Sequence, residues 1–236
     1  EDSPYKVDLV LKAIRRSGII FENLLDIGCG AGVVVRTLSE KYPSKFFYGI
    51  DVSSDVSKFW KDSEKENLKY GNDSTRYFDV AICLDVFEHV ESLDAVLSEC
   101  YRVLKDGGKL LVAFPQYLQP LEAHLGFVTK AVALHWFFPG NIIAEAYNEI
   151  IEERKPSSYW YKPVSYPLRS WEKLFSLNGT SISSFKNLVK SQDWVSSDFK
   201  VKPILTDGRK SEWIIFKVLN KFFIPLAHLP PFNELF

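Results

Sequence analysis

The sequence predicts an α/β fold with a doubly wound, mainly parallel sheet, and three observations favour it. Short apolar runs alternate with segments of helical periodicity along the first half of the chain. The first apolar run leads into a glycine-rich turn and then into a helical segment. Glycine or proline follows several helical segments, where it would end them. Repeated strand–helix units of this kind build a sheet with helices on both faces.

The elements of this core follow in regular order. Val7, Val10, Leu11 and Ile14 recur at helical spacing, and Gly18 stands where a left-handed cap would end that first helix. The expected strands are 24–27, 46–50, 68–70, 78–84 and 109–114. The expected helices between them are 34–42, 54–63 and 93–104.

The helix expected at 93–104 has the clearest signals. Its apolar residues fall on one helical face: Leu93, Val96, Leu97, Cys100, Val103 and Leu104. Ser92 is placed to cap its first turn, and Gly107-Gly108 is expected to end it before the next strand.

The alternation stops after Gln116, which predicts an insertion. We expect an α/β core, an inserted helical and aromatic lid, the remainder of the core and a C-terminal tail, at 1–116, 117–170, 171–220 and 221–236. An amphipathic stretch is expected within the insertion, around Ile143, Ala146, Tyr147 and Ile150. A helix at 171–177 and two strands, near 181–185 and at 212–218, would complete a seven-stranded sheet whose last two strands pair antiparallel.

The composition argues against several classes of function. The net charge is −1, from 29 basic and 30 acidic residues without a long run of one sign, so no nucleic-acid partner is expected. Three cysteines form no C-x-x-C pair, which favours a reducing, cytoplasmic location. The four histidines have no metal-ligand spacing, so no metal site is expected. The most apolar stretch, 125–144, is interrupted by charged and polar residues and does not predict a spanning helix.

The glycine-rich turn is the strongest candidate for a binding site. Gly28, Gly30 and Gly32 would expose backbone N–H groups at a helix N-terminus and let a ligand approach closely. The dinucleotide fingerprint G-x-G-x-x-G is incomplete, because its sixth position is Val33. Asp51, at the end of the second strand, is placed to accept hydrogen bonds from a ribose diol. The alternative is a bare turn, with Asp51 capping the next helix.

Three stretches of the sequence resemble a known family. They are "LLDIGCGAG", "FYGIDVS" and "YFDVAICLDVFEHVESLDAVLSECYRVLKDGGKLLVAFP". With them the chain resembles the class I S-adenosylmethionine-dependent methyltransferases, in particular enzymes that methylate small molecules and lipids. The likeness covers most of 20–116 and implies their Rossmann-like fold and S-adenosyl-L-methionine as cofactor.

The resemblance also implies roles for individual residues. Asp26 would orient the amino group of the methionine moiety, Asp51 would hold the ribose hydroxyls, and Val52 would pack on the adenine. Asp73 matches the acidic position near the adenine amine, although a solvated turn residue is the alternative. The complete implied cofactor-binding set is Asp26, Gly28, Cys29, Gly30, Gly32, Asp51, Val52, Asp73, Leu84 and Asp85.

Methyl transfer from a sulfonium depends more on positioning than on acid–base help. If the acceptor is a hydroxyl, a general base would be useful, and His89 of the E-H-V turn is the candidate. A turn-stabilising hydrogen bond is the alternative role for His89. His124 and His135 of the insertion, and His228 near the C-terminus, are the other histidines.

The aromatic residues of the insertion allow two interpretations. They could line a pocket over the cofactor for a lipid-like or aromatic small-molecule acceptor, or form the small core that an insertion needs. The expected substrate-contacting residues are His124, His135, Trp136, Tyr159, Trp160 and Tyr161. Membrane contact, through "FFPGNII" or the tail, would be peripheral at most.

Two other classes of protein share parts of this pattern. An NAD(P)-dependent oxidoreductase would have the same sheet, turn and Asp51, but this chain lacks the third fingerprint glycine. A non-catalytic scaffold with the same fold would typically have lost the glycine turn or the ribose acid, and this chain retains both.

Overall fold

The structure, a computed structural model, consists of two compact units. One unit comprises 1–87 with 92–114, and the other comprises 88–91 with 115–236. Within them the structure describes 3–71, 77–115, 134–154, 167–171, 178–192 and 194–195, together with Leu125, Thr129 and Ala131.

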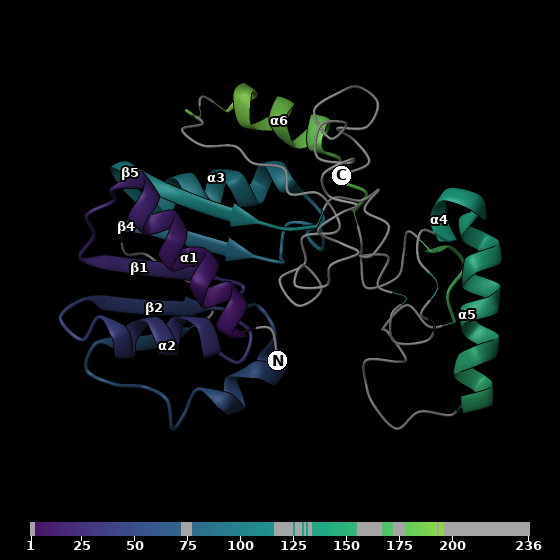
Figure 1. Cartoon of the computed structure of the whole chain (residues 1–236), viewed down its shortest axis with the longest axis horizontal. Coiled ribbons are helices and arrows are strands. Elements are labelled where there is room, and N and C mark those ends of the chain that lie inside the picture. Colours follow the sequence, from purple (N-terminus) through teal and green to yellow (C-terminus); the bar gives the residue numbers. More distant parts are fainter. Residues whose placement is uncertain are drawn as a thin grey trace, which may run out of the picture. The chain divides into compact units, whose positions relative to one another are not determined.

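The first unit contains a five-stranded parallel sheet in the order β3-β2-β1-β4-β5 (Figure 1). The strands are β1 Asn23–Ile27, β2 Phe46–Ile50, β3 Leu68–Gly71, β4 Phe78–Leu84 and β5 Leu104–Ala113. The chain runs outward from β1 to β3 and then returns to place β4 on the other side of β1. Open α/β sheets bind ligands where the strand order reverses in this way.

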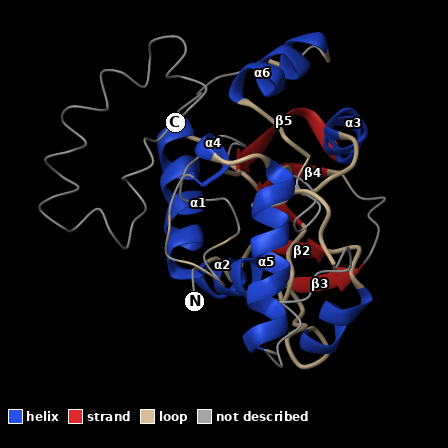
Figure 2. Ribbon diagram, turned by 90° about the vertical axis from the view of Figure 1, so that its right-hand side faces the viewer, coloured by secondary structure: helices blue, strands red, loops and turns tan. Residues whose placement is uncertain are grey.

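Helices cover both faces of this sheet (Figure 2). Helices α1 (Ser3–Ser17) and α2 (Val33–Lys41) bury their apolar stripes in one core with alternate residues of the strands. Val10, Val35 and Ile82 are fully buried members of that core. Helix α3 (Leu93–Val103) buries a separate face and lies on the opposite side. The predicted doubly wound α/β fold is therefore confirmed for the described strands.

A polar anchor holds the amino-terminal ends of the strands in register. The carboxylate of Asp79 in β4 accepts hydrogen bonds from the N–H groups of Glu22 and Asn23, at 2.8 and 3.0 Å, and from Lys105 Nζ at 2.6 Å. With one end fixed, the carboxyl-terminal ends of β1 and β4 meet at the opposite edge.

Several local predictions are confirmed by the structure. Gly18 follows α1 with a left-handed φ of 61°, as a C-terminal cap requires. The hydroxyl of Ser92 accepts a hydrogen bond from the N–H of Ala95 at 3.2 Å and so caps α3.

Two predictions near the sheet were wrong. The helix expected at 54–63 is only a 3-10 helix, η1 (Ser54–Phe59), because none of its residues is buried and no packing stabilises a longer helix. Strand β5 begins at Leu104, before the glycine pair. Gly107, with a φ of 74°, falls inside a register shift between the strand pairs, so it forms a bulge and does not end the helix.

The seven-stranded sheet is not borne out at one position. The strand expected near 181–185 is the start of helix α6 (Ile182–Ser191). Ser181 and Ser184 form a reciprocal capping box there, and this local bonding favours the start of a helix. The strand expected at 212–218 and most of the helix expected at 171–177 lie outside the described residues.

The second unit has an apolar core of its own around helix α5 (Gly140–Arg154). The core residues are Leu125, Ile143, Ala144, Tyr147, Ile151, Leu168 and Trp171. Asn148 fixes the chain across this helix, because its side chain both donates to and accepts from the backbone of Leu168, at 2.8 and 2.9 Å. Ala146, expected on the apolar face, is exposed, and Ala144 is buried in its place. The face of α5 that packs against the core therefore contains Ala144 and not Ala146.

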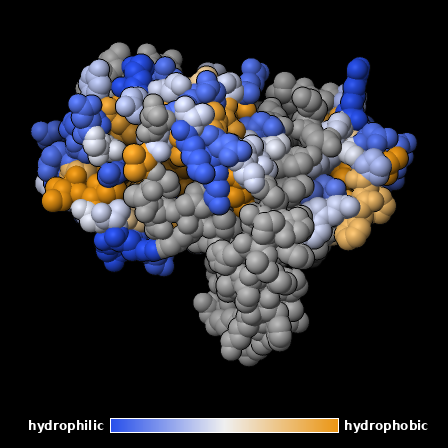
Figure 3. Space-filling view, turned by 90° about the horizontal axis from the view of Figure 1, so that it is seen from above, coloured by the Kyte–Doolittle hydropathy of each residue, from blue (hydrophilic) through white to orange (hydrophobic). Residues whose placement is uncertain are grey.

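Exposed apolar side chains differ between the units. In the α/β unit they lie scattered among polar ones in the view from above (Figure 3). In the second unit, Trp136, Phe137, Phe138 and Ile142 are exposed close together in sequence, around helix α4 (Leu134–Phe137). No helix in the described part of the chain combines the length and apolarity needed to cross a membrane.

Candidate functional site

The candidate site lies at the carboxyl-terminal edge of the sheet, where the strand order reverses. The turn at 28–32 follows β1, Asp51 follows β2, and Asp85 follows β4. Parallel pairing of β1 with both β2 and β4 brings these three segments to one edge. The structure thus gathers most of the residues that the sequence predicted as a binding set.

The conformation of the glycine turn is fixed by backbone torsion angles and hydrogen bonds. Gly28, Gly30 and Gly32 have φ values of 70°, 54° and 75°, which side chains other than glycine rarely tolerate. The N–H groups of Gly28 and Cys29 both donate to the carbonyl oxygen of Ile50, at 2.8 and 2.9 Å. Gly32 then donates to Cys29 and accepts from Arg36, which starts α2.

The three glycines make room for different neighbours. A Cβ atom on Gly28 would collide with the Val86 side chain, and one on Gly32 would lie 2.5 Å from Cε1 of Tyr70. A Cβ atom on Gly30 would meet no described atom within 4 Å. Two of the glycines are therefore required by the packing of the protein itself. At Gly30 the space that a Cβ atom would fill is open to a ligand, although its N–H and carbonyl groups are bonded to Asp51 and Trp60.

This difference predicts unequal costs for alanine at the two positions. Both substitutions incur the strain of a left-handed residue, about 1–2 kcal/mol. Gly32→Ala must also displace the Tyr70 ring, so we expect it to lower the free energy of unfolding by at least about 1 kcal/mol more than Gly30→Ala. Urea denaturation of the two variants measures the difference. Equal losses would mean that the ring moves aside without cost.

Asp51 already fixes part of the turn. Its Oδ2 accepts from the N–H of Gly30 at 2.8 Å, and its Oδ1 accepts from the N–H of Ser53 at 2.9 Å. A carboxylate has about four acceptor positions, so capacity remains for two hydroxyl donors of a ligand. The side chain of the next residue, Val52, is 98% exposed, which suits a residue that packs on a flat ligand group.

Asp26 is an unusually placed carboxyl group. It lies at the end of β1, is only 3% exposed, and its pKa is raised to about 7. Burial is the main cause of this shift; the positive charge of Lys6 opposes it and the negative charge of Asp51 adds to it.

Lys6 of α1 also contacts the end of β4. Its Nζ lies 2.6 Å from Oδ2 of Asp85. Among the described residues, Asp85 is the one non-glycine residue with a left-handed φ, 57°. Lys6 is paired with Asp85, so Asp51, and Asp26 when it is ionised, leave this edge acidic and favour a ligand that carries positive charge.

The remaining cofactor candidates have different surroundings. The Cys29 thiol is partly buried, and burial raises its pKa well above the ordinary value, so it stays neutral. Leu84 is buried at the end of β4. Asp73 lies outside the described residues.

His89 lies in a turn at 88–91 that belongs to the second unit and is held by hydrogen bonds from another residue of that unit. Its Nε2 is 3.7 Å from Oε1 of the buried Glu88. The N–H of Asn178 donates to the Glu88 carbonyl oxygen at 2.9 Å, and its side chain donates to that of Val90 at 2.8 Å. Asn178 therefore fixes the turn that carries His89, a role the sequence pattern did not indicate.

The candidate acceptor residues are only partly described. The ring of His135 stacks on Trp171, with centroids 4.6 Å apart, and meets Trp136 edge-on at 6.1 Å. This packing ties His135 to the core of the second unit. His124, Tyr159, Trp160, Tyr161 and His228 lie outside the described residues.

Sequence reasoning missed three residues around the turn: Lys6, Trp60 and Tyr70. Lys6 adjoins the apolar stripe of the first helix, which places it beside the sheet. Trp60 and Tyr70 contact glycine-turn residues 30 and 38 positions away, and nothing in the local pattern indicates such pairs.

Comparison with known proteins finds that the chain is similar to methyltransferases. Residues 25–112 match the model of a family described as "Methyltransferase domain". The chain is 27% identical over 119 residues to the ubiquinone biosynthesis O-methyltransferase of Nitrosomonas europaea, covering 46% of this chain and 49% of that protein. The enzyme of the same name from Pseudomonas aeruginosa is 27% identical over 112 residues, covering 42% and 47%. The chain spans about half the length of these curated relatives.

Solved structures similar to the chain include two methyltransferases. An S-adenosylmethionine-dependent methyltransferase from Clostridium acetobutylicum is 21% identical, with a TM-score of 0.43, over 52% of this chain and 54% of that one. The plantazolicin methyltransferase, solved with S-adenosylhomocysteine (SAH), is 15% identical, with a TM-score of 0.48, over 79% and 61%.

Proposed function

We propose that this chain transfers a methyl group from S-adenosylmethionine to a small acceptor molecule, because residues 25–112 match the model of a family described as "Methyltransferase domain". The observation that carries the proposal is the arrangement of three neighbouring features at the sheet edge. They are the open space at the Cβ position of Gly30, the carboxylate of Asp51 that accepts from the Gly30 N–H, and the exposed side chain of Val52. An adenosine-linked amino acid matches these three features.

The residues present fit this cofactor. Asp51 has free acceptor capacity for the ribose hydroxyls, and Val52 offers an apolar face to the adenine. Asp26 is a buried carboxyl group that a ligand ammonium would neutralise. When bound, S-adenosylmethionine supplies a methyl group activated by a sulfonium. The protein's own task is then to hold the acceptor in line with that methyl group, which can contribute several kcal/mol.

The acceptor is proposed to be a lipid-like or aromatic small molecule that the segment 117–170 recognises. The exposed aromatic side chains of Trp136, Phe137 and Phe138 support an apolar acceptor. The curated relatives are named as O-methyltransferases, which supports a hydroxyl group as the methylated position. For a hydroxyl acceptor, His89 is the proposed base, and the Glu88 carboxylate 3.7 Å away would stabilise its protonated form. The sequence has three cysteines and no C-x-x-C pair, which supports a reducing, cytoplasmic location.

Ligand binding tests the proposal directly. In isothermal titration calorimetry the purified protein is expected to bind S-adenosylmethionine and SAH and not NAD, and mass spectrometry is expected to detect SAH retained through purification. Gly30→Leu is the matched negative control, because its side chain would fill the open space at the turn. Binding of NAD alone would instead support an oxidoreductase, and binding of neither ligand would support a non-catalytic scaffold.

A further inference from the structure

Two aromatic side chains contact the glycine turn at 28–32. Trp60, just after η1, and Tyr70, in β3, stack with ring centroids 5.3 Å apart and an angle of 8° between their planes. The Tyr70 ring occupies space that two glycines leave open, since a Cβ atom on Gly32 or Gly49 would lie 2.5 or 2.8 Å from it. The chain thus omits two side chains to seat this ring.

Both aromatic residues donate hydrogen bonds to carbonyl groups of the turn. Trp60 Nε1 donates to the carbonyl oxygen of Gly30 at 2.9 Å, and the Tyr70 hydroxyl donates to that of Gly32 at 3.4 Å. Burial raises the pKa of Tyr70 to about 12, so its hydroxyl keeps the proton that it donates. On the other side of the same peptide segment, the N–H of Gly30 is held by Asp51.

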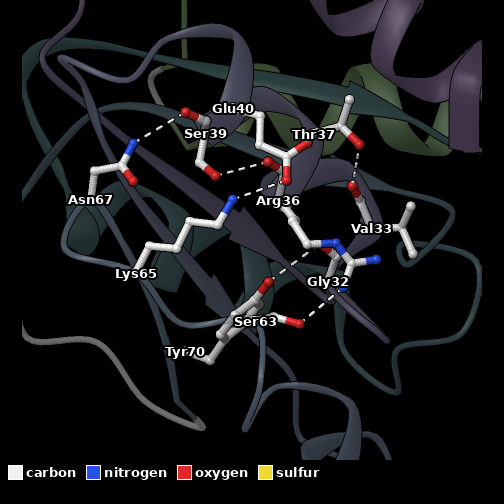
Figure 4. A network of polar contacts seen from close by, with 10 residues as sticks. All are labelled: Gly32, Val33, Arg36, Thr37, Ser39, Glu40, Ser63, Lys65, Asn67 and Tyr70. Carbon is white, nitrogen blue, oxygen red and sulfur yellow. Dashed lines mark hydrogen bonds and ion pairs between the residues drawn. The ribbon is translucent and has the colours of Figure 1, made fainter.

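A polar network connects the chain segment between Trp60 and Tyr70 to α2 (Figure 4). Arg36 donates to the Ser63 hydroxyl at 2.9 Å, and Ser63 in turn donates its N–H to the Trp60 carbonyl oxygen at 2.8 Å. Further along, Lys65 pairs with Glu40 at 2.9 Å. The aromatic pair is therefore braced by the same helix that the glycine turn begins.

From this arrangement we propose that Trp60 and Tyr70 are positioning residues for the cofactor: they hold the carbonyl groups of Gly30 and Gly32 from behind and keep the turn in the conformation that receives it. The inference rests on the proposed function and deepens it. Neither residue needs to touch the cofactor, because both act through the turn.

The physical reason is the freedom of the turn. Three glycines with positive φ values lose more backbone entropy on ordering than other residues do. If protein side chains order the turn before the cofactor arrives, that loss does not reduce the cofactor's affinity. Loss of either hydrogen bond should therefore have two effects: the turn of the ligand-free protein becomes less ordered, and the affinity for the cofactor decreases.

The test uses two single substitutions that remove the donor and leave an aromatic ring at the position. Tyr70→Phe removes only the hydroxyl, and Trp60→Phe replaces the indole with a smaller ring that has no N–H donor. The matched control is Tyr77→Phe, which removes an exposed hydroxyl just before β4, at the other edge of the sheet. Amide hydrogen exchange of the ligand-free protein, read on peptides that contain residues 28–33, reports the turn. Calorimetry reports the affinity for SAH.

For Trp60→Phe we expect amide exchange in the turn and the Kd for SAH each to rise about three- to tenfold. Tyr70→Phe should act in the same direction but less strongly, because its bond is longer. The control should leave both quantities within twofold of the wild type.

Unchanged turn exchange in Trp60→Phe and Tyr70→Phe, or unchanged SAH affinity when the wild type binds SAH, overturns the inference. Absence of SAH binding by the wild type would instead reject the proposed function. The amide exchange rates would then show by themselves whether Trp60 and Tyr70 order the turn: faster exchange in the variants means that they do, and unchanged exchange means that they do not. If Trp60→Phe fails to fold, Tyr70→Phe carries the same comparison.

Discussion

Replacing Asp51 with alanine is expected to raise the Kd for SAH about a hundredfold or more. The carboxylate has two roles in the proposed site, since it fixes the N–H of Gly30 and has acceptor capacity for the ribose hydroxyls. Each hydrogen bond to a charged group contributes about 1.5–3 kcal/mol, so two such bonds account for about two to four orders of magnitude in affinity. Calorimetric titration with SAH measures the change.

Two further variants isolate the carboxylate's contribution. Asp55→Ala removes an exposed acidic residue from η1 and should leave the affinity unchanged. Asp51→Asn retains one acceptor oxygen and should fall between the wild type and Asp51→Ala. An Asp51→Ala protein that bound SAH within threefold of the wild type would disprove the ribose assignment.

Asp26→Asn is expected to make the ligand-free protein more stable at alkaline pH. The pKa of Asp26 is raised from 3.8 to about 7, mainly by burial, so the folded protein binds this proton more tightly than the unfolded chain does. This contribution to the free energy of unfolding is complete below pH 4 and is lost as the pH rises through 7. The difference of about 3 pKa units corresponds to about 4 kcal/mol at most.

The asparagine variant has no such proton to lose. Urea unfolding at pH 5 and pH 8.5 should therefore show a gain over the wild type that grows with pH, whereas Asp106→Asn, at an exposed position in β5, should show none. Identical pH dependence in Asp26→Asn and the wild type would mean that Asp26 is ionised in the fold at neutral pH.

The same carboxyl group links cofactor binding to pH. A ligand ammonium requires the ionised form of Asp26, so wild-type affinity for SAH should rise between pH 6 and about 7.5, with proton release on binding. Asp26→Asn should lose this pH dependence and bind more weakly at pH 8. Increased stability together with decreased affinity is the result that a purely structural role for Asp26 does not predict.

The sequence was most informative where one local signal determined one element. Helical spacing followed by Gly18 predicted α1 and its left-handed cap, and Ser92 predicted the start of α3. Predictions failed where local signals competed. A strand was expected near 181–185, but the capping box of Ser181 and Ser184 starts a helix there.

The same division holds for the candidate site. The order of strand, glycine turn and acidic strand end indicated Gly30 and Asp51 as neighbours, and the structure joins them at 2.8 Å. Their aromatic support was not predictable, because the contact between Tyr70 and Gly32 spans 38 positions and depends on how β3 packs beside the turn.

The sequence by itself determined the five strands of the described sheet, the left-handed cap after α1 and the acids at the strand ends, because these follow from backbone sterics and local periodicity. Only the tertiary structure decided which glycine stays open to a ligand and how tightly Asp26 holds its proton. Both properties arise from burial and from contacts between distant segments. Local sequence patterns do not reveal either property, because both require the folded arrangement of the chain.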